Sequence, residues 1–183
     1  SRLQGHPHRD FLPALETSSG PLGSGLSQAV GMALAERIDA GKASNKFFYC
    51  LLGDGELDEG QNWEAIMLAG REKLHNLIAI IDRNNIQIDG FTEDIMPLEP
   101  LADKWRAFNW HVQEIDGHNF EAIDEAVNQA KAIFSQPSVI IAHTIPSKGV
   151  PEFERQYQWH GKPPNKAEGE LALRELRTLG GKI

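Results

Sequence analysis

Two short apolar runs, each ending in polar residues, constrain the fold of this chain more than any other feature of its sequence. The first covers residues 47–52 and ends in Gly53-Asp54-Gly55, and the second covers residues 77–81 and ends in Asp-Arg-Asn-Asn. Continuous apolar runs of this length are typical of strands that are buried on both faces of a parallel sheet. Parallel neighbours need a crossover connection, and residues 63–74 carry apolar side chains at helical spacing between the two runs. The sequence therefore predicts a β-α-β unit.

Helical and strand-like patterns alternate along the rest of the chain. We expect further helices over 30–38 and 120–134 and further strands over 110–115 and 138–143. A proline-rich loop over 146–165 precedes a last short helix, which places Ala172, Leu176 and Leu179 on one side. This order predicts the α/β class: a doubly wound, mostly parallel sheet with helices on both faces. Ligands of such sheets bind at the carboxyl ends of the strands.

Length, charge and cysteine content narrow the function classes. A chain of 183 residues fits a single domain over 1–183. Upstream residues are expected to be missing, because the sequence begins with a Gly-His-Pro turn and no helix or strand is expected before it.

With 18 Lys and Arg against 26 Asp and Glu, the formal net charge of -8 argues against nucleic acid or an anionic membrane as a partner. No run approaches the roughly 18 apolar residues of a membrane span. Cys50, the one cysteine, is expected to be a buried thiol, and we expect a soluble, cytoplasmic protein.

Asp54 and Asn84 carry the most informative polar groups. They lie 30 positions apart, one at the end of each apolar run. If the two strands are neighbours, the side-chain oxygens of Asp54 and Asn84 point into one crevice, and Asp54 is expected to face solvent or a ligand. Both side chains could then bind the same hard cation. Mg²⁺ prefers about six oxygens, so a carboxylate, an amide and a backbone carbonyl leave room for two diphosphate oxygens and a water. A Gly-Asp-Gly tripeptide alone is equally compatible with a simple turn between a strand and a helix.

The surroundings of the tripeptide carry a resemblance to a known family. Glu59-Gly60, a crossover helix and a strand follow it, and then comes the segment Asn-Asn-Ile-Gln-Ile-Asp-Gly over residues 84–90. The whole stretch resembles the thiamine diphosphate motif in its transketolase form. The resemblance implies that Asp54 and Asn84 bind a divalent cation, Mg²⁺ or Ca²⁺, through their side chains and that Ile86 binds it through its backbone carbonyl. It also implies that Gly55 and Asn84 contact the diphosphate of thiamine diphosphate.

Two further segments near the start of the chain extend the resemblance. Gly5-His6-Pro7 is similar to a family motif whose histidine faces the donor substrate, and residues 17–25 are similar to a glycine-rich loop. In that loop the positions of Gly20, Pro21 and Leu22 would line the pyrimidine and thiazolium rings of the cofactor. Without the resemblance, such a loop is an ordinary glycine-rich helix start.

His160 belongs to the segment Trp-His-Gly-Lys-Pro over residues 159–163, which is also similar to the family, so the resemblance covers nearly the whole chain. There the matching histidine reaches the diphosphate and the sugar, so His6 and His160 are the expected catalytic residues. Alone, a histidine in a proline-rich loop is usually a solvated polar residue. One departure concerns a lysine that many members place near the diphosphate, because the matching position here is Pro146, with Lys148 two residues later.

Several other residues have no functional assignment. Five histidines show no paired ligand spacing and are expected to be structural or exposed: His8, His75, His111, His118 and His143. Four aromatic residues are expected in the core: Trp105, Phe108, Trp110 and Phe120. Glu59 stays undecided between favouring the start of its helix and joining an acidic network at the interface between subunits, as in the family.

The resemblance implies transfer of a two-carbon ketol unit between sugar phosphates, as in the pentose phosphate pathway. It also implies that the partner is the C-terminal, pyrimidine-binding part of a transketolase, because in the family a glutamate from that part meets the pyrimidine ring. Two copies of each chain would form the hetero-oligomer. The alternatives are part of a deoxyxylulose phosphate synthase or 2-oxoacid dehydrogenase, and a non-catalytic regulatory protein. A nicotinamide-binding Rossmann domain is disfavoured, because Gly20-Pro21-Leu22-Gly23-Ser24-Gly25 has the wrong glycine spacing and follows no apolar strand.

Overall fold

The structure is a computed structural model, and it describes residues 4–40 and 44–178. Leu179, expected on the apolar side of the last helix, lies outside the described residues.

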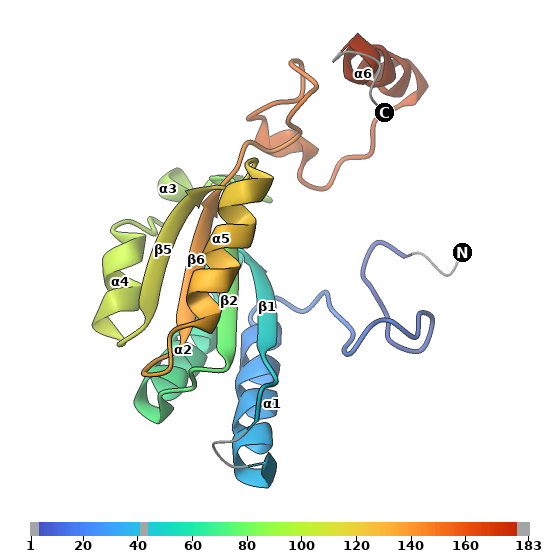
Figure 1. Ribbon diagram of the computed structural model, residues 1–183. Helices are drawn as coiled ribbons and strands as arrows, with labels where there is room; N and C mark the ends of the chain where they lie inside the picture. The colour runs from blue at the N-terminus through green and yellow to red at the C-terminus, as the bar shows by residue number, and fades with distance from the viewer. Residues whose placement is uncertain (1–3, 41–43, 179–183) are drawn as a thin grey trace.

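Four strands form one fully parallel sheet. They are β1 (Phe48–Gly53), β2 (Leu77–Arg83), β5 (His111–Asp116) and β6 (Ser138–His143), in the spatial order β1-β2-β6-β5. All four carboxyl ends therefore lie at one edge of the sheet (Figure 1). The parallel α/β sheet is confirmed, and β1 and β2 are neighbours, with Gly53 paired to Asp82. The polar residues that follow these strands thus meet at one edge.

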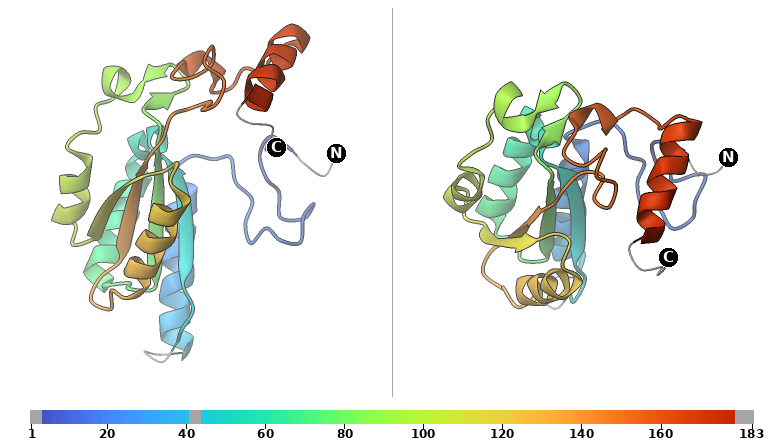
Figure 2. Two further views of the ribbon diagram at one scale, coloured as in Figure 1. Left: turned by 45° about the horizontal axis from the view of Figure 1, so that its top comes forward. Right: turned by 90° about the horizontal axis from the view of Figure 1, so that it is seen from above.

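Helices cover both faces of the sheet. Three of them lie against one face and enclose the larger core: α1 (Ser24–Ala40), α2 (Gly60–Glu72) and α4 (Leu101–Ala107). On the opposite face α5 (Phe120–Lys131) packs Ala126 and Ala130 against Ile78 and Ile140 (Figure 2). Gly70 brings α2 close to the chain after α4, because a Cβ atom at this position would lie 1.9 Å from the carbonyl oxygen of Phe108.

Short elements and two aromatic residues depart from expectation. The pattern did not predict α4, nor the hairpin of β3 (Ile86–Gln87) and β4 (Gly90–Phe91), nor α3 (Thr92–Ile95). Phe120 was expected in the core but is 87% exposed, and Phe134, the last residue of the helix expected over 120–134, is 75% exposed. Phe120 is the first residue of α5, directly after the capping Asn119, so it lies beyond the part of the helix that covers the sheet. Trp105 and Trp110 are buried as expected.

The two terminal segments project from the body on the same side. Residues 4–23 form a winding segment of turns and loops, and the chain after β6 leads through the short helix η3 (Tyr157–Trp159) to α6 (Lys166–Thr178) (Figures 1 and 2). Within the described ranges no helix is long and apolar enough to cross a membrane.

Candidate functional site

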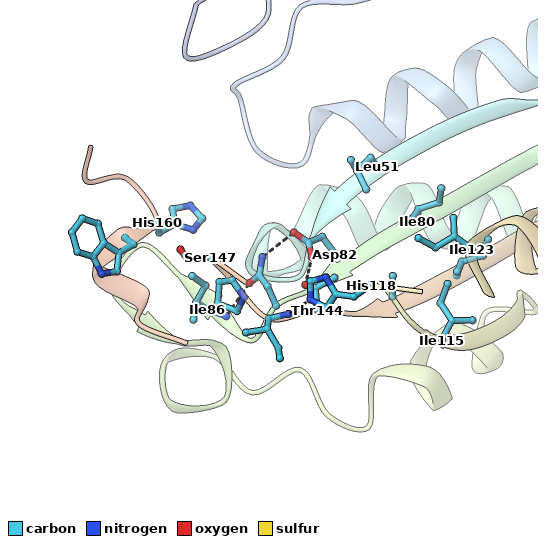
Figure 3. A pocket seen from close by; sticks show the side chains of 17 residues that line it. Leu51, Ile80, Asp82, Ile86, Ile115, His118, Ile123, Thr144, Ser147 and His160 are labelled. Carbon is cyan, nitrogen blue, oxygen red and sulfur yellow. Dashed lines mark hydrogen bonds between the residues drawn. The ribbon is translucent and has the colours of Figure 1, made fainter. Parts of the chain in front are cut away.

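A cavity of about 590 Å³ opens at the carboxyl edge of the sheet. Its polar part comes from the segments that follow β2, β5 and β6 and from the loop of η3, and its apolar part comes from the α5 face of the sheet. Figure 3 shows His160 at one end of this cavity and the aliphatic side chains of Leu51, Ile80 and Ile123 at the other. The volume lies in the range of small-molecule sites, about 300–1,000 Å³. The position agrees with the general rule for ligands of parallel α/β sheets.

Asp82 organises the polar floor of the cavity. Its Oδ1 accepts a hydrogen bond from the hydroxyl of Thr144 at the end of β6, and its Oδ2 accepts one from Nδ2 of Asn84 at 3.1 Å (Figure 3). The Asn84 amide nitrogen is therefore turned toward Asp82. Its oxygen accepts a hydrogen bond from the backbone N–H of Ile86 at 3.0 Å and keeps one lone pair. Asn84 thus presents an oxygen, rather than a nitrogen, on the Ile86 side.

Asp54 lies beside this floor and is completely enclosed. Asp54 was expected to face solvent or a ligand, and the solvent alternative is wrong, because its exposed fraction is 0%. Oδ2 accepts hydrogen bonds from Nη1 of Arg83 at 2.9 Å and from the backbone N–H of Asn85 at 2.7 Å. Oδ1 accepts one from the adjacent Gly55 N–H at 2.8 Å. Burial raises the pKa of the Asp54 carboxyl above its ordinary value, and the hydrogen bonds from Arg83, Asn85 and Gly55 oppose that rise.

Gly55, in the turn after β1, packs closely against the short strand β3. A Cβ atom at this position would lie 2.6 Å from Cβ of Gln87 and 3.6 Å from the carbonyl oxygen of Ile86, so a larger residue would force the two segments apart. Asp54 touches Asn85, and Gly55 lies beside Ile86, so the carboxylate, the Asn84 amide oxygen and the Ile86 carbonyl belong to one small region. These are hard oxygen donors of the kind that Mg²⁺ and Ca²⁺ prefer. The described residues contain no group of three or more His, Cys, Asp or Glu side chains that could hold a metal ion.

The N-terminal candidate residues form a separate group. A Cβ atom on Gly20 would lie 3.1 Å from Cγ of His6, so these two residues are in contact, and the φ of +129° at Gly20 is one that side chains rarely adopt. Pro21 and Leu22 continue this segment, and Leu22 is exposed. None of the four lines the cavity in the structure.

His160 lines the cavity, and aromatic contacts fix the loop that carries it. The neighbouring Trp159 stacks on Phe153 with ring centroids 3.8 Å apart, and Nζ of Lys162 lies 4.2 Å from the centre of the Trp159 ring. Tyr157 packs edge-on against Phe91 of the β3–β4 hairpin. The η3 loop therefore rests on the hairpin that also provides Ile86.

Asp82, His118 and Thr144 are among the polar cavity residues that carried no functional assignment in the sequence. His118 was expected to be structural or exposed, yet its ring lines the cavity and its Nε2 accepts a hydrogen bond from the backbone N–H of Ile145 at 2.7 Å. The signal that identifies all three is position, because each lies at or just after the carboxyl end of a strand. Pro146 lines the cavity as well, whereas Lys148 does not.

A parallel α/β sheet with oxygen donors and a small-molecule cavity at its carboxyl edge defines an α/β cofactor-binding domain. The chain belongs to the family described as transketolase, thiamine diphosphate binding domain, whose model matches residues 1–179.

Relatives and solved structures agree with this family. The chain is 48% identical over 166 residues to a 6-deoxy-6-sulfo-D-fructose transketolase subunit of Clostridium sp. (strain MSTE9), covering 91% of this chain and 59% of the relative. It is 41% identical over 177 residues to an apulose-4-phosphate transketolase subunit of Actinobacillus succinogenes, covering 97% of this chain and 63% of the relative. The crystal structure of transketolase from Campylobacter jejuni superposes with a TM-score of 0.89 at 37% identity, covering 99% of this chain and 28% of that one. The chain thus spans less than two thirds of each of these proteins.

Proposed function

We propose that this chain is the diphosphate-binding subunit of a transketolase, which binds thiamine diphosphate and a divalent cation and transfers two-carbon ketol units between sugar phosphates. One observation carries the proposal. Asp54, Asn84 and Ile86, the three positions that match the cation ligands of the family, provide three oxygen donors in one region beside the cavity.

The residues present fit a cation and a diphosphate. Asp54 would bind the cation through its carboxylate, Asn84 through its amide oxygen and Ile86 through its carbonyl, and Mg²⁺ suits these ligands as well as Ca²⁺ does. The resemblance makes Gly55 a diphosphate contact, and the start of α2 at Gly60 adds a helix N-terminus at the same carboxyl end of the sheet. Because the cation neutralises the diphosphate, an acidic protein can hold it with little help from Lys or Arg.

The cofactor would supply the electron sink for cleavage of the carbon–carbon bond next to a carbonyl. His160 would hydrogen-bond the diphosphate and the sugar from the cavity wall, and it could move protons there. His6, with Gly20, Pro21 and Leu22, would close over the cofactor rings from the N-terminal segment. In the structure that segment stands apart from the cavity, so this part of the proposal requires it to approach when cofactor and partner are present.

A pyrimidine-binding polypeptide is proposed as the partner, with two copies of each chain in the complex. Two relatives are named as transketolase subunits, and this chain covers 59% and 63% of their lengths, which supports a divided enzyme. The named relatives act on different sugars, a sulfo-sugar in one case and apulose 4-phosphate in the other. The proposed substrate class is therefore phosphorylated or similarly anionic ketoses and aldoses, with the pentose phosphate sugars as the first to assay.

Titration calorimetry of the chain with thiamine diphosphate, with Mg²⁺ and with a chelator, tests the proposal. We expect affinity for the cofactor only when the cation is present. Asn84→Ala removes one proposed cation ligand and is expected to weaken binding by about tenfold or more. Asn128→Ala is the matched control, because Asn128 is exposed on α5 and donates only to Asp124. Cation-independent binding, or equal affinities of the two variants, would contradict the proposed site.

A further inference from the structure

Arg83 is a buried cation at the centre of the candidate site that the proposed function does not use. It is the last residue of β2, and its neighbour Asp82 lines the cavity, as does Asn84, the residue that follows it. Because successive residues of a strand point to opposite faces, Arg83 points away from the cavity and beneath it. Its exposed fraction is 2%. A buried guanidinium is retained only where its donors are satisfied.

Four hydrogen bonds hold the guanidinium of Arg83. Nη1 donates to Oδ2 of Asp54 at 2.9 Å and to Oγ1 of Thr92 at 2.7 Å. Nη2 donates to Oε1 of Glu93 at 2.7 Å and to Oε1 of Glu99 at 3.0 Å. Arg83 therefore joins the proposed cation ligand to the segment that follows the β3–β4 hairpin. Such a planar group with several fixed donors orients its partners in a way that a lysine cannot.

The hydrogen bonds of Asp54 distinguish its two oxygens. Oδ2 accepts from Arg83 and from the backbone of Asn85, so both of its lone pairs are used. Oδ1 accepts only from Gly55, so it retains one lone pair. Asn85 adopts a φ of 67°, which is uncommon for a residue with a side chain and which brings its N–H to Oδ2. Rotation of the carboxylate would break both bonds to Oδ2 at once.

We propose that Arg83 is a positioning residue, which fixes the Asp54 carboxylate so that Oδ1 alone is presented to the divalent cation. The inference rests on the proposed function, because the cation site is part of it. Thr92, Glu93 and Glu99 hold the other side of the guanidinium and so contribute to the same orientation. The charges of Glu93 and Glu99 also offset the repulsion between Arg83 and a cation bound nearby.

Arg83→Lys is the main test, because it keeps the positive charge and removes the planar set of donors. Binding of Mn²⁺ is measured by electron paramagnetic resonance on the full chain with thiamine diphosphate, and binding of Ca²⁺ is measured by competition. Mn²⁺ stands in for Mg²⁺, which requires nearly regular octahedral geometry, whereas Ca²⁺ tolerates displaced ligands. We expect Mn²⁺ affinity to fall by about ten- to hundredfold and Ca²⁺ affinity to fall clearly less. A purely structural role would lower both affinities together.

Arg106→Lys is the matched control, since Arg106 is half exposed and pairs with Asp103 and Glu114 far from Asp54. Thr92→Val is a second variant for the case that Arg83→Lys does not fold, because it removes one acceptor from Nη1 and touches neither Asp54 nor the cation. It is expected to lower Mn²⁺ affinity more than Ca²⁺ affinity, in the same direction as Arg83→Lys. If Arg83→Lys binds both ions with wild-type affinity, or loses the same affinity for both, the positioning role of Arg83 is wrong while the proposed cation site still stands. Thr92→Val is judged in the same way if Arg83→Lys does not fold. A wild-type chain that binds neither ion would overturn the cation site and with it this inference.

Discussion

Oε1 of Glu56 accepts a hydrogen bond from the backbone N–H of Gly23 at 2.9 Å, although the two residues are 33 positions apart. The other oxygen of the same carboxylate lies 3.3 Å from the N–H of Gly53 at the end of β1. Glu56 therefore fastens the glycine-rich loop before α1 to the turn that carries Asp54. The loop is expected at the cofactor rings and the turn at the diphosphate, and this carboxylate joins the two.

Glu56→Ala is expected to release the glycine-rich loop from the turn. Two backbone N–H groups would lose their acceptor, so we expect the free energy of unfolding to fall by about 1–3 kcal/mol. Affinity for thiamine diphosphate is expected to fall as well. Urea unfolding and calorimetry measure the two effects, with Glu125→Ala, at an exposed position of α5, as the control. Unchanged values for Glu56→Ala would show that the loop is held by other contacts.

Asp54→Ala is expected to destabilise the chain strongly. Asp54 is enclosed and accepts from Nη1 of the buried Arg83, so its removal leaves that nitrogen with the Thr92 hydroxyl as its acceptor, while Glu93 and Glu99 still pair with Nη2. The backbone N–H groups of Asn85 and Gly55 also lose their acceptor, and each buried donor left without a partner costs about 1–3 kcal/mol. Asp54→Asn keeps the volume and one acceptor oxygen, so it is expected to lose less stability. Loss of cation binding in Asp54→Asn, with the fold verified by circular dichroism, separates the chemical role of the carboxylate from its structural one.

Cys50 is expected to be unreactive in the folded chain. Burial, with a smaller contribution from the nearby Glu56 carboxylate, raises the pKa of its thiol to about 12. Since the thiolate is the reactive form, alkylation by iodoacetamide at a pH of about 8 is expected to be far slower in the native chain than in urea. Mass spectrometry of the labelled protein measures both rates. Comparable rates would mean that the edge of β1 opens readily.

Much of the sheet could be predicted from the sequence because its two central strands, β2 and β6, are buried on both faces and are continuous apolar runs. The runs at 47–52 and 138–143 lie within one residue of β1 and β6. The expectation of burial on both faces is wrong for β1, because it is an edge strand whose Tyr49 and Leu51 are exposed. The seven-residue helix α4 and the two-residue strands β3 and β4 were missed, because elements this short contain too few residues to show a period. Phe120 was misplaced because periodicity gives the face of a helix and not the extent of the sheet that it covers.

The candidate site could be predicted only in part, for a related reason. Asn84 and Ile86 follow a strand directly, so topology alone brings them to the cavity. Asp54 pairs with Arg83, which Thr92 and Glu93 hold in turn, and this network forms through tertiary contacts that no local pattern encodes. Likewise, Thr144 and the segment after β5 reach the cavity only because β5 and β6 end at the same edge.

His160→Ala is expected to reduce turnover far more than Asn165→Ala, although both residues lie after η3. His160 lines the cavity, whereas Asn165 accepts a hydrogen bond from the N–H of Glu168 in the first turn of α6. Asn165→Ala is therefore expected to cost about 1 kcal/mol of helix stability and little activity. The comparison is made by assaying ketol transfer with the partner polypeptide present. Equal turnover of the two variants would mean that His160 is a solvated histidine without a catalytic role.

The last prediction concerns the carboxylates near the cavity and the activation of the cofactor. Activation of thiamine diphosphate at its C2 position depends on a carboxylic side chain hydrogen-bonded to the pyrimidine ring. Among the described residues that line the cavity, the only carboxylate is that of Asp82, and it is engaged by Thr144 and Asn84. Glu56 is tied to Gly23 and Gly53. The one carboxylate among the described cavity residues is therefore held in place by Thr144 and Asn84, and we expect the pyrimidine to take its carboxylic partner from another polypeptide.

We accordingly expect the purified chain to fold and to bind the cofactor weakly, but to catalyse no ketol transfer. Exchange of the C2 hydrogen for deuterium, followed by NMR of the cofactor, is expected to stay near the rate of free thiamine diphosphate. Adding a pyrimidine-binding transketolase polypeptide is expected to raise that rate strongly, whereas a version of it whose pyrimidine-contacting glutamate is changed to alanine is not. Rapid exchange on this chain alone would mean that a carboxylic acid of its own reaches the pyrimidine, and the divided-enzyme proposal would then be wrong.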